Sequence, residues 1–190
     1  DYVSTYDATA VKKIKAEDGL IIGMLNMDEF AQGSSGETSA FGATQNPAAP
    51  GLIPGGTSSG CGAALAADFC DLALGSDTGG SSRNPASHCG VVGVKPSYSS
   101  VSRYGLIDSA MSFDQIAPMA KNVSDVALML EVISGKDEKD SISQDSGKIN
   151  LKELDKTPKN LKIGVLDLSG LKVDERISKL VDERINKAVK

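Results

Sequence analysis

The stretch PGGTSSGCGAALAADFCDLALGSDTGGSSR, residues 54–83, contains two runs of glycines and hydroxyl side chains with small and apolar residues between them. The small residues from Ser59 to Phe69 predict a helix, and LALGSD, Leu72 to Asp77, predicts a strand. One run therefore lies at the start of a helix and the other follows a strand. A helix followed by a strand favours an α/β fold in which layers of helices cover a sheet.

The sequence on both sides of this stretch predicts more helices and strands. Asp7 and Ser124 are expected to cap two helices that Gly19 and Gly135 end. The expected strands are LIIGML (20–25), VVGVKPS (91–97) and LKIGVLDL (161–168). An amphipathic helix is expected from Asp174 onward, because apolar residues recur there at helical spacing: Ile177, Leu180, Val181, Ile185, Ala188 and Val189.

Two segments between these elements are polar or rich in glycine. Residues 33–56 form a long loop, and long loops in compact domains usually line a site. Residues 136–161 are charged and without periodicity, which is typical of a surface linker. We expect residues 1–190 to form a single domain with this linker inside it.

The distribution of charge argues against direct binding of nucleic acid. The net charge is −5, and residues 1–135 carry 7 Lys and Arg against 14 Asp and Glu. Nucleic-acid binding needs clustered basic side chains. If RNA is involved, we expect another subunit to hold it.

The cysteines and the apolar runs indicate a cytosolic protein. Cys61, Cys70 and Cys89 have no C-x-x-C spacing, so we expect reduced, buried thiols rather than a metal site. No apolar run approaches the roughly 18 residues that a membrane span needs. The first residues have no signal-peptide pattern.

The two runs of glycine and hydroxyl residues have three possible roles. A phosphate loop needs a lysine after its last glycine, but Cys61 follows Gly60. Tight turns are a second possibility, since glycine and serine favour them. In the third, Ser81 is a nucleophile and the amides of a glycine-rich loop form an oxyanion hole for acyl transfer. His88 is the one histidine, and we interpret it as structural, so a base other than histidine is expected for Ser81.

The whole segment from Gly55 to Tyr98 resembles the signature of the amidase signature superfamily. Within that superfamily, four further motifs are most similar to the A subunits of tRNA-dependent amidotransferases: YDATAV, NMDEFAQGSSGETSAFG, VSRYGLID and SFDQIAPM. The resemblance implies a partial amidase signature fold, with a mixed central sheet covered by helices on both faces. It covers Tyr6 to Met119 closely and the rest of the chain more loosely.

The resemblance also implies a Ser–Ser–Lys triad, in which a serine preceded by a cis peptide bond links a lysine base to the nucleophile. It places the nucleophile at Ser81 and the oxyanion loop at Thr78, Gly79 and Gly80. Asp77 and Arg83 would support this loop. Gly33 and Ser34 match the loop on the substrate side.

Two departures from the family pattern affect this assignment. Thr57 stands where the family has its cis-bonded serine, and Ser58 could take that role if the loop shifts by one residue. Thr57 keeps the hydroxyl and adds a methyl group. The family's K-D-N lysine has no match in residues 1–190, so we expect a fragment that is inactive alone; Lys95 is a weak alternative.

The activity that the resemblance implies is hydrolysis of glutamine to supply ammonia for converting Glu-tRNA(Gln) to Gln-tRNA(Gln). A B-type subunit would bind the tRNA and use ATP and Mg²⁺, and a small C-type subunit would complete a heterotrimer. No cofactor or metal is expected in this chain. Two alternatives stay open: a stand-alone amidase acting on another small carboxamide, and a scaffold that has lost catalysis.

Overall fold

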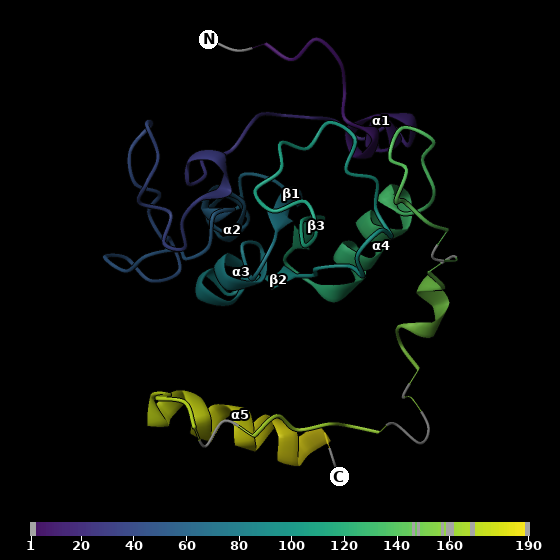
Figure 1. Cartoon of the computed structure of the whole chain (residues 1–190). Helices are drawn as coiled ribbons and strands as arrows, with labels where there is room; N and C mark the ends of the chain where they lie inside the picture. Colours follow the sequence, from purple (N-terminus) through teal and green to yellow (C-terminus); the bar gives the residue numbers. More distant parts are fainter. Residues whose placement is uncertain are drawn as a thin grey trace. The chain divides into compact units, whose positions relative to one another are not determined.

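The computed structural model describes residues 3–145, 147, 149–156, 158, 162–167 and 170–188. The chain divides into two compact units, Asp1–Leu154 and Asp155–Lys190. Figure 1 shows the elements of both. All residues of the predicted site lie in the first unit.

The first unit is built on a three-stranded antiparallel sheet with the order β1-β3-β2. The strands are β1 (Leu72–Asp77), β2 (Val92–Gly93) and β3 (Gln115–Ala120). In the register of β1 and β3, Leu72 lies opposite Ala120 and Asp77 lies opposite Gln115. The sequence correctly predicted β1, whereas the strand expected over 91–97 is reduced to two residues.

The central strand β3 was not predicted. All six of its residues are buried, yet Pro118 stands in the middle, and proline argues against a central strand because it has no N–H to donate. Its carbonyl oxygen still accepts a hydrogen bond from the Val94 amide at 3.1 Å. The sheet therefore tolerates Pro118 in an interior strand.

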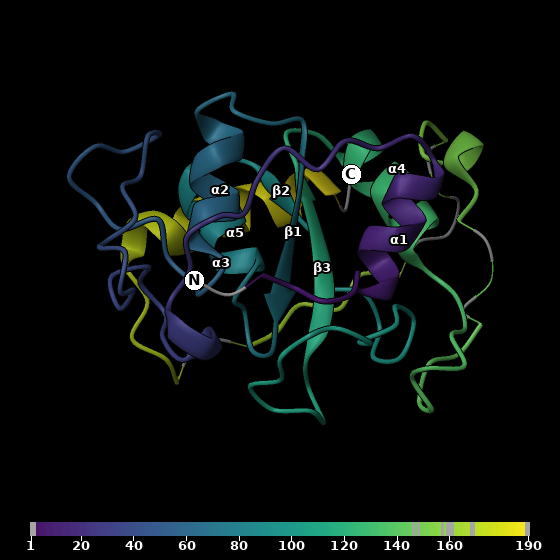
Figure 2. The same ribbon diagram turned by 90° about the horizontal axis from the view of Figure 1, so that it is seen from above.

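Helices cover both faces of the sheet, as Figures 1 and 2 show. On one face, α2 (Ser59–Ala66) and α3 (Arg83–Cys89) cover a core in which small side chains surround Leu65 and Met119. On the other face lies α4 (Val123–Ile133), on which α1 (Thr9–Ala16) packs, with Ile116 of β3 in that core. The expected α/β fold class is confirmed.

Two of the predicted helix caps are wrong. Helix α4 is capped by Asn122, whose Oδ1 accepts from the Asp125 amide at 2.9 Å, and not by Ser124. Helix α1 begins after Ala8 without a side-chain cap, while Asp7 instead accepts a hydrogen bond from Lys15 at 2.8 Å. In α4 a neighbouring amide side chain took the role that spacing had assigned, whereas α1 begins without any side-chain cap.

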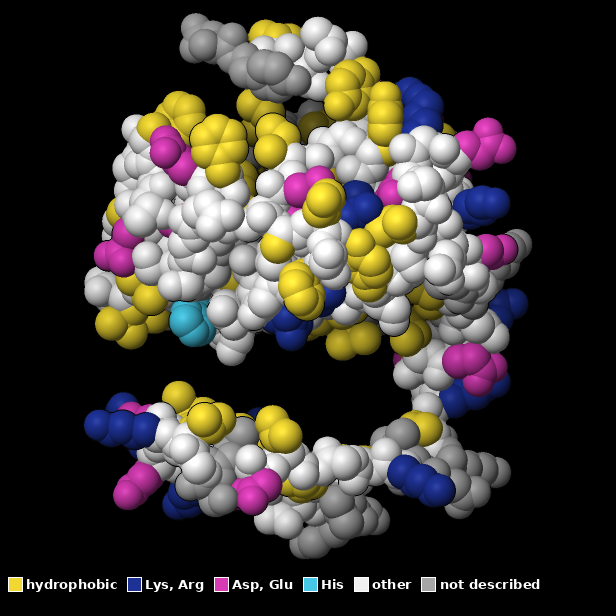
Figure 3. All heavy atoms as spheres, in the orientation of Figure 1, with side chains coloured by type: hydrophobic (Ala, Val, Ile, Leu, Met, Phe, Trp, Pro, Cys, Tyr) yellow, Lys and Arg dark blue, Asp and Glu magenta, His cyan; other side chains and the backbone are white. Residues whose placement is uncertain are grey.

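Two predicted strands are also wrong. Residues 20–25 and 162–167 are not strands, and most of their apolar side chains are exposed; Met24 is 94% and Leu166 79% exposed. Leu161 and Leu168 of the second prediction lie outside the described residues. Apolar side chains are visible over much of the face of the first unit drawn in Figure 3. An apolar run forms a strand only where a neighbouring strand accepts its backbone hydrogen bonds.

The start of the expected linker is held firmly in the first unit. Asp140 and Ser143 are buried, and Asp140 pairs with Arg103. Two short 3-10 helices, η1 (Glu29–Ala31) and η2 (Leu151–Glu153), also belong to this unit. That residues 1–190 form a single domain, with 136–161 as a linker inside it, stays a prediction.

In the second unit, the predicted amphipathic helix is present as α5 (Glu175–Ala188). Ile177, Leu180 and Val181 are each more than 40% exposed, and Val189 lies outside the described residues. Within the described part of the chain, no helix has the length and apolar character needed to cross a membrane.

Candidate active site

Backbone hydrogen bonds bring together the three segments that carry the predicted site. The Gly56 amide donates to the Ser34 carbonyl at 2.7 Å, which joins the substrate-side loop to the first glycine run. The Ser58 amide donates to the Ser81 carbonyl at 3.0 Å, which joins the first run to the second. Residues 33–34, 57–58 and 81 thus meet in one region beside α2, α3 and β1.

Gly56 makes this close approach possible. It has φ +63°, and a Cβ atom there would lie 2.7 Å from the Ser81 carbonyl oxygen and 2.3 Å from Pro85. Only glycine combines this backbone conformation with the space available. Gly56 therefore allows the two loops to pack against each other.

Asp77 organises the second run from inside the protein. Its carboxylate is fully buried and accepts from the amides of Gly80, Ser82 and Arg83 at 2.8–3.1 Å. The Arg83 guanidinium adds two bonds, at 3.0 and 2.9 Å. Burial alone would raise the pKa of Asp77, but the Arg83 side chain and these amides lower it below its ordinary value. The contact expected between Asp77 and Arg83 is therefore present.

The amides beside Ser81 differ in their availability. The Gly80 amide is already bound to Asp77, so in this structure it is not a free donor. Among the described residues, by contrast, no acceptor is hydrogen-bonded to the amides of Gly79 or Ser81. The predicted oxyanion loop thus offers Gly79 and Ser81 as its free donors, and the roles of Thr78, Gly79 and Gly80 stay predictions.

The two candidates for the bridging hydroxyl lie in different environments. The Ser58 hydroxyl donates to the Ser76 carbonyl at 3.1 Å and accepts from the Ser76 amide and from Ser82. The Thr57 hydroxyl is completely buried and has no hydrogen-bond partner among the described residues. A buried hydroxyl without a partner costs about 1–3 kcal/mol. Thr57 therefore has the hydroxyl that is free to serve a reaction.

The peptide bond before Thr57 is trans, as are all peptide bonds within the described residues. The cis bond that the resemblance implied is thus not found. A cis bond before a residue other than proline costs about 3–4 kcal/mol, and only enclosing structure can maintain it.

Asp28 shapes the substrate-side loop, a role that the sequence did not indicate. Its buried carboxylate accepts from the Gly36 amide at 3.0 Å and from both the amide and the hydroxyl of Thr38. A Cβ at Gly33 would lie 2.4 Å from this carboxylate. Burial alone would raise the pKa of Asp28, but these hydrogen bonds lower it. The close packing explains why glycine occupies position 33.

Other nucleophiles are less suited to the chemistry. The three cysteines are free thiols, as expected, and Cys61 and Cys89 are buried. Burial raises the pKa of Cys61 to about 12, so the reactive thiolate is scarce. His88 is exposed, and its ring lies against Gly55. Within the described residues, no group of three or more His, Cys, Asp and Glu side chains is arranged to hold a metal ion.

Sequence comparison identifies relatives of this chain. A family model described as Amidase matches residues 1–190. The A subunit of glutamyl-tRNA(Gln) amidotransferase from Methanothermobacter thermautotrophicus is 57% identical over 185 residues, which cover 97% of this chain and 40% of that protein. The chain thus spans about two-fifths of the length of the curated relatives that it matches.

Solved structures show the same relationship. The crystal structure of the A subunit of glutamyl-tRNA(Gln) amidotransferase from Thermotoga maritima has a TM-score of 0.76 and 52% identity, covering 77% of this chain and 32% of that one. The 6-aminohexanoate cyclic dimer hydrolase in complex with its substrate has a TM-score of 0.71 and 35% identity, over 75% and 30% of the two chains. The family match over the whole chain and these shared folds agree with the joined glycine–serine loops, and the chain belongs to the amidase family.

Proposed function

We propose that this protein hydrolyses the side-chain amide of glutamine and supplies the ammonia to a tRNA-dependent amidotransferase. The Ser81 oxygen attacks the amide carbon, the carbon–nitrogen bond breaks, and ammonia leaves with the proton taken from Ser81. Water then cleaves the acyl-enzyme ester and releases glutamate. The amides of Gly79 and Ser81 would stabilise the negative oxygen that develops in each step.

One observation supports this proposal: the Ser58 amide donates to the Ser81 carbonyl, and the residue before Ser58 is Thr57, whose buried hydroxyl has no partner among the described residues. A serine hydroxyl is a weak nucleophile until a base removes its proton. The position of Thr57 supports a relay that carries this proton toward a lysine base. The relatives' length leaves room for that lysine outside residues 1–190.

The relay predicts different outcomes for two substitutions of Thr57. The test uses a completed chain, in which residues 1–190 are joined to the regions of the Methanothermobacter relative that they do not cover. Thr57→Val removes the hydroxyl but keeps the shape, and we expect kcat for glutamine hydrolysis to fall about 100-fold. Thr57→Ser keeps the hydroxyl and should retain most of the activity. Parent-level kcat in both variants would exclude Thr57 as the relay and leave Ser58 as the remaining candidate.

The partners follow from the kind of reaction. We propose a B-type subunit that binds tRNA and uses ATP and Mg²⁺ to activate the glutamyl ester, with a small C-type subunit in a cytosolic heterotrimer. The excess of acidic over basic side chains in residues 1–135 supports a tRNA site on another subunit.

A second function, that of a stand-alone amidase, is favoured by the likeness to the 6-aminohexanoate cyclic dimer hydrolase. The same loops would serve there with another small carboxamide as substrate. The two functions differ in whether partner subunits control the rate of hydrolysis. In a subunit that supplies ammonia, hydrolysis without an acceptor would waste glutamine, so its rate should depend on the partners.

Coupling is therefore the test of the proposed function. Glutamate release by the completed chain is measured alone, with B- and C-type subunits, and with those subunits plus Glu-tRNA(Gln) and ATP. We expect at least a tenfold rise in rate in the full mixture. Fast hydrolysis of simple amides with no effect of partners would establish the stand-alone amidase, and the absence of hydrolysis under all conditions would favour a non-catalytic scaffold.

A further inference from the structure

Asp114 is a buried carboxylate that contacts the predicted oxyanion loop from the neighbouring strand. It precedes β3 directly and is 2% exposed. Its Oδ1 accepts a hydrogen bond from the Thr78 hydroxyl, and its Oδ2 accepts from the amides of Ser109 and Ala110 at 2.7 and 2.8 Å. Asp77 pairs with Gln115 in the antiparallel register of β1 and β3. Thr78 follows β1 and Asp114 precedes β3, so the two residues face each other at the same edge of the sheet.

We infer that Asp114 is a positioning residue, which acts through Thr78 to fix the direction of the free amide at Gly79. This inference rests on the proposed function of Ser81. Asp77 holds the second half of the loop through the amides of Gly80 and Ser82, but none of its bonds reaches Thr78 or Gly79. The bond from Thr78 to Asp114 therefore provides the only side-chain restraint that the described residues place on the first half.

The loop needs such a restraint because of its composition. Gly79 is exposed, and a Cβ built on it would contact no atom within 4 Å, so its neighbours do not confine it. Glycine also has the greatest backbone freedom of any residue. A hydrogen bond from Thr78 to a charged carboxylate is stronger than one to a neutral acceptor, and it restrains the residue immediately before this flexible point.

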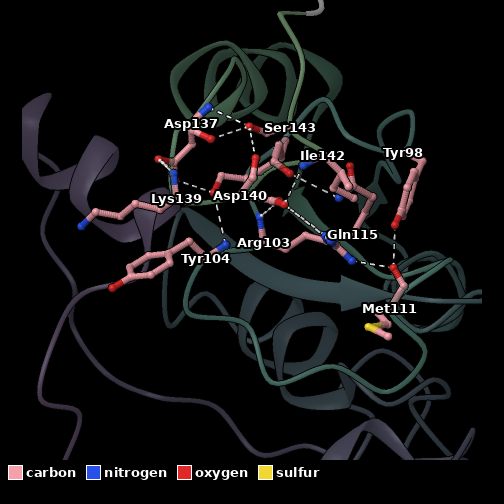
Figure 4. Close-up of polar contacts among 12 residues, drawn as sticks. Tyr98, Arg103, Tyr104, Met111, Gln115, Asp137, Lys139, Asp140, Ile142 and Ser143 are labelled. Carbon is pink, nitrogen blue, oxygen red and sulfur yellow. Dashed lines mark hydrogen bonds and ion pairs between the residues drawn. The ribbon is translucent and has the colours of Figure 1, made fainter.

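The turn that carries Asp114 is itself held in place by hydrogen bonds, so the position of the Asp114 carboxylate is fixed. Figure 4 shows Tyr98 and Arg103 both reaching the carbonyl of Met111, at the middle of the turn. The Tyr98 hydroxyl donates to it at 2.6 Å. Arg103 also pairs with the buried Asp140 at 3.5 Å, which ties the turn to the segment that follows α4.

The same turn contacts the substrate-side loop. The Gln32 side chain donates to the Ser109 hydroxyl at 2.7 Å, and Gln32 directly precedes Gly33. Ser109 is also one of the two residues whose amides bind Asp114. The turn over 109–114 thus contacts both loops of the site, which gives Asp114 a role in their relative placement and not merely in local folding.

Thr78→Val tests this inference, because it removes the hydroxyl while keeping a β-branched side chain of the same shape. We expect kcat of the completed chain for glutamine to fall about 10- to 100-fold with KM little changed, since a misplaced oxyanion donor acts on the transition state. Thr78→Ser keeps the donor and should recover most of kcat. Thermal unfolding of each variant is measured alongside.

Thr9→Val is a matched control. Thr9 also donates its hydroxyl to a carboxylate, that of Asp137, but it lies in α1 and outside the site. We expect this variant to lose thermal stability to a similar degree as Thr78→Val and to keep its kcat. A comparable fall of kcat in Thr9→Val would show that kcat follows general stability, and would overturn the inference.

A double-mutant cycle shows whether Asp114 acts through Thr78. Asp114→Ala alone should lower kcat at least as much as Thr78→Val, and adding Thr78→Val to it should lower kcat little further. Parent-level kcat in Thr78→Val would overturn the positioning role. So would a double variant whose fall in kcat equals the product of the two single falls. Either result would leave Ser81 as nucleophile. Loss of Ser81-dependent hydrolysis in the parent chain would instead remove the proposed function, and this inference with it.

Discussion

Ser81→Ala in the completed chain is expected to lower glutaminase activity at least about 10⁴-fold, a greater loss than removal of any other side chain of the site should cause. The reason is that the acyl-enzyme cannot form without the Ser81 oxygen. Ammonia release in a coupled assay measures the loss. Folding should be preserved, because the Ser81 hydroxyl is not hydrogen-bonded to any described residue and its backbone carbonyl, which binds Ser58, remains.

Ser87→Ala serves as the control for this substitution. Ser87 lies in α3, the short helix that follows Ser81, and is exposed. The same chemical change at Ser87 should leave activity at the parent level. A glutamine analogue with an electrophilic group in place of the amide should label the peptide that contains residue 81 in the parent chain and in Ser87→Ala, but not in Ser81→Ala. Turnover that survives in Ser81→Ala would refute the assignment of the nucleophile.

Asp77→Ala is expected to have the largest effect on stability. The substitution leaves the amides of Gly80, Ser82 and Arg83, the first two of them buried, and the Arg83 guanidinium without their shared acceptor. Breaking a buried ion pair by removing one partner costs about 3–5 kcal/mol. Arg83 is half exposed and can be rehydrated, so we expect the lower end, roughly 3 kcal/mol of the free energy of unfolding. Chemical denaturation followed by circular dichroism measures it.

Asp174→Ala provides a control with the same chemistry at the surface. Arg176 binds Asp174 through two nitrogens, at 3.0 and 2.8 Å, as Arg83 binds Asp77. The Arg176 side chain is 88% exposed, however, so water replaces the lost ion pair. The substitution also removes the hydrogen bond from the Arg176 amide to Asp174 at the start of α5, so we expect a measurable loss of stability that is smaller than in Asp77→Ala. Equal losses in Asp77→Ala and Asp174→Ala would show that burial of Asp77 does not contribute.

The effect of Asp77 also depends on pH. Its pKa in the folded protein lies below that in the unfolded chain, which is about 3.9. The carboxylate therefore contributes its full stability above that value, and the contribution is lost as pH falls through the lower folded pKa. Asp77→Ala should accordingly lose less stability than the parent between neutral and acid pH.

The secondary structure could be predicted from the sequence only where the local residue pattern agreed with the tertiary contacts of the segment. The run of small residues from Ser59 correctly predicted the start of α2, and LALGSD correctly predicted β1. Central strand β3 was missed because Pro118 argues against a strand, although a carbonyl contact to Val94 accommodates it. The apolar run over 20–25 was read as a strand, but a strand depends on a partner that the run itself does not specify.

The residues of the candidate site were likewise predicted only in part. The resemblance to the amidase signature indicated Ser81, Asp77, Arg83, Thr57 and the substrate-side loop. Nothing in the sequence indicated that Asp28 and Asp114 hold the surrounding loops, because a buried aspartate that accepts three hydrogen bonds looks the same in sequence as an exposed one. Both could have been suspected only from their places in the NMDEF and SFDQIAPM motifs.

The sequence alone indicated the family and the nucleophile candidate, since the resemblance depends only on residue types at matching positions. Only the tertiary structure decided which hydroxyl is left unpaired, which amides are free and which carboxylates support the loops. These properties arise from contacts between residues distant in the chain, such as Thr78 with Asp114 and Ser58 with Ser81. Burial then makes each of these contacts strong, because water cannot replace a partner inside the protein.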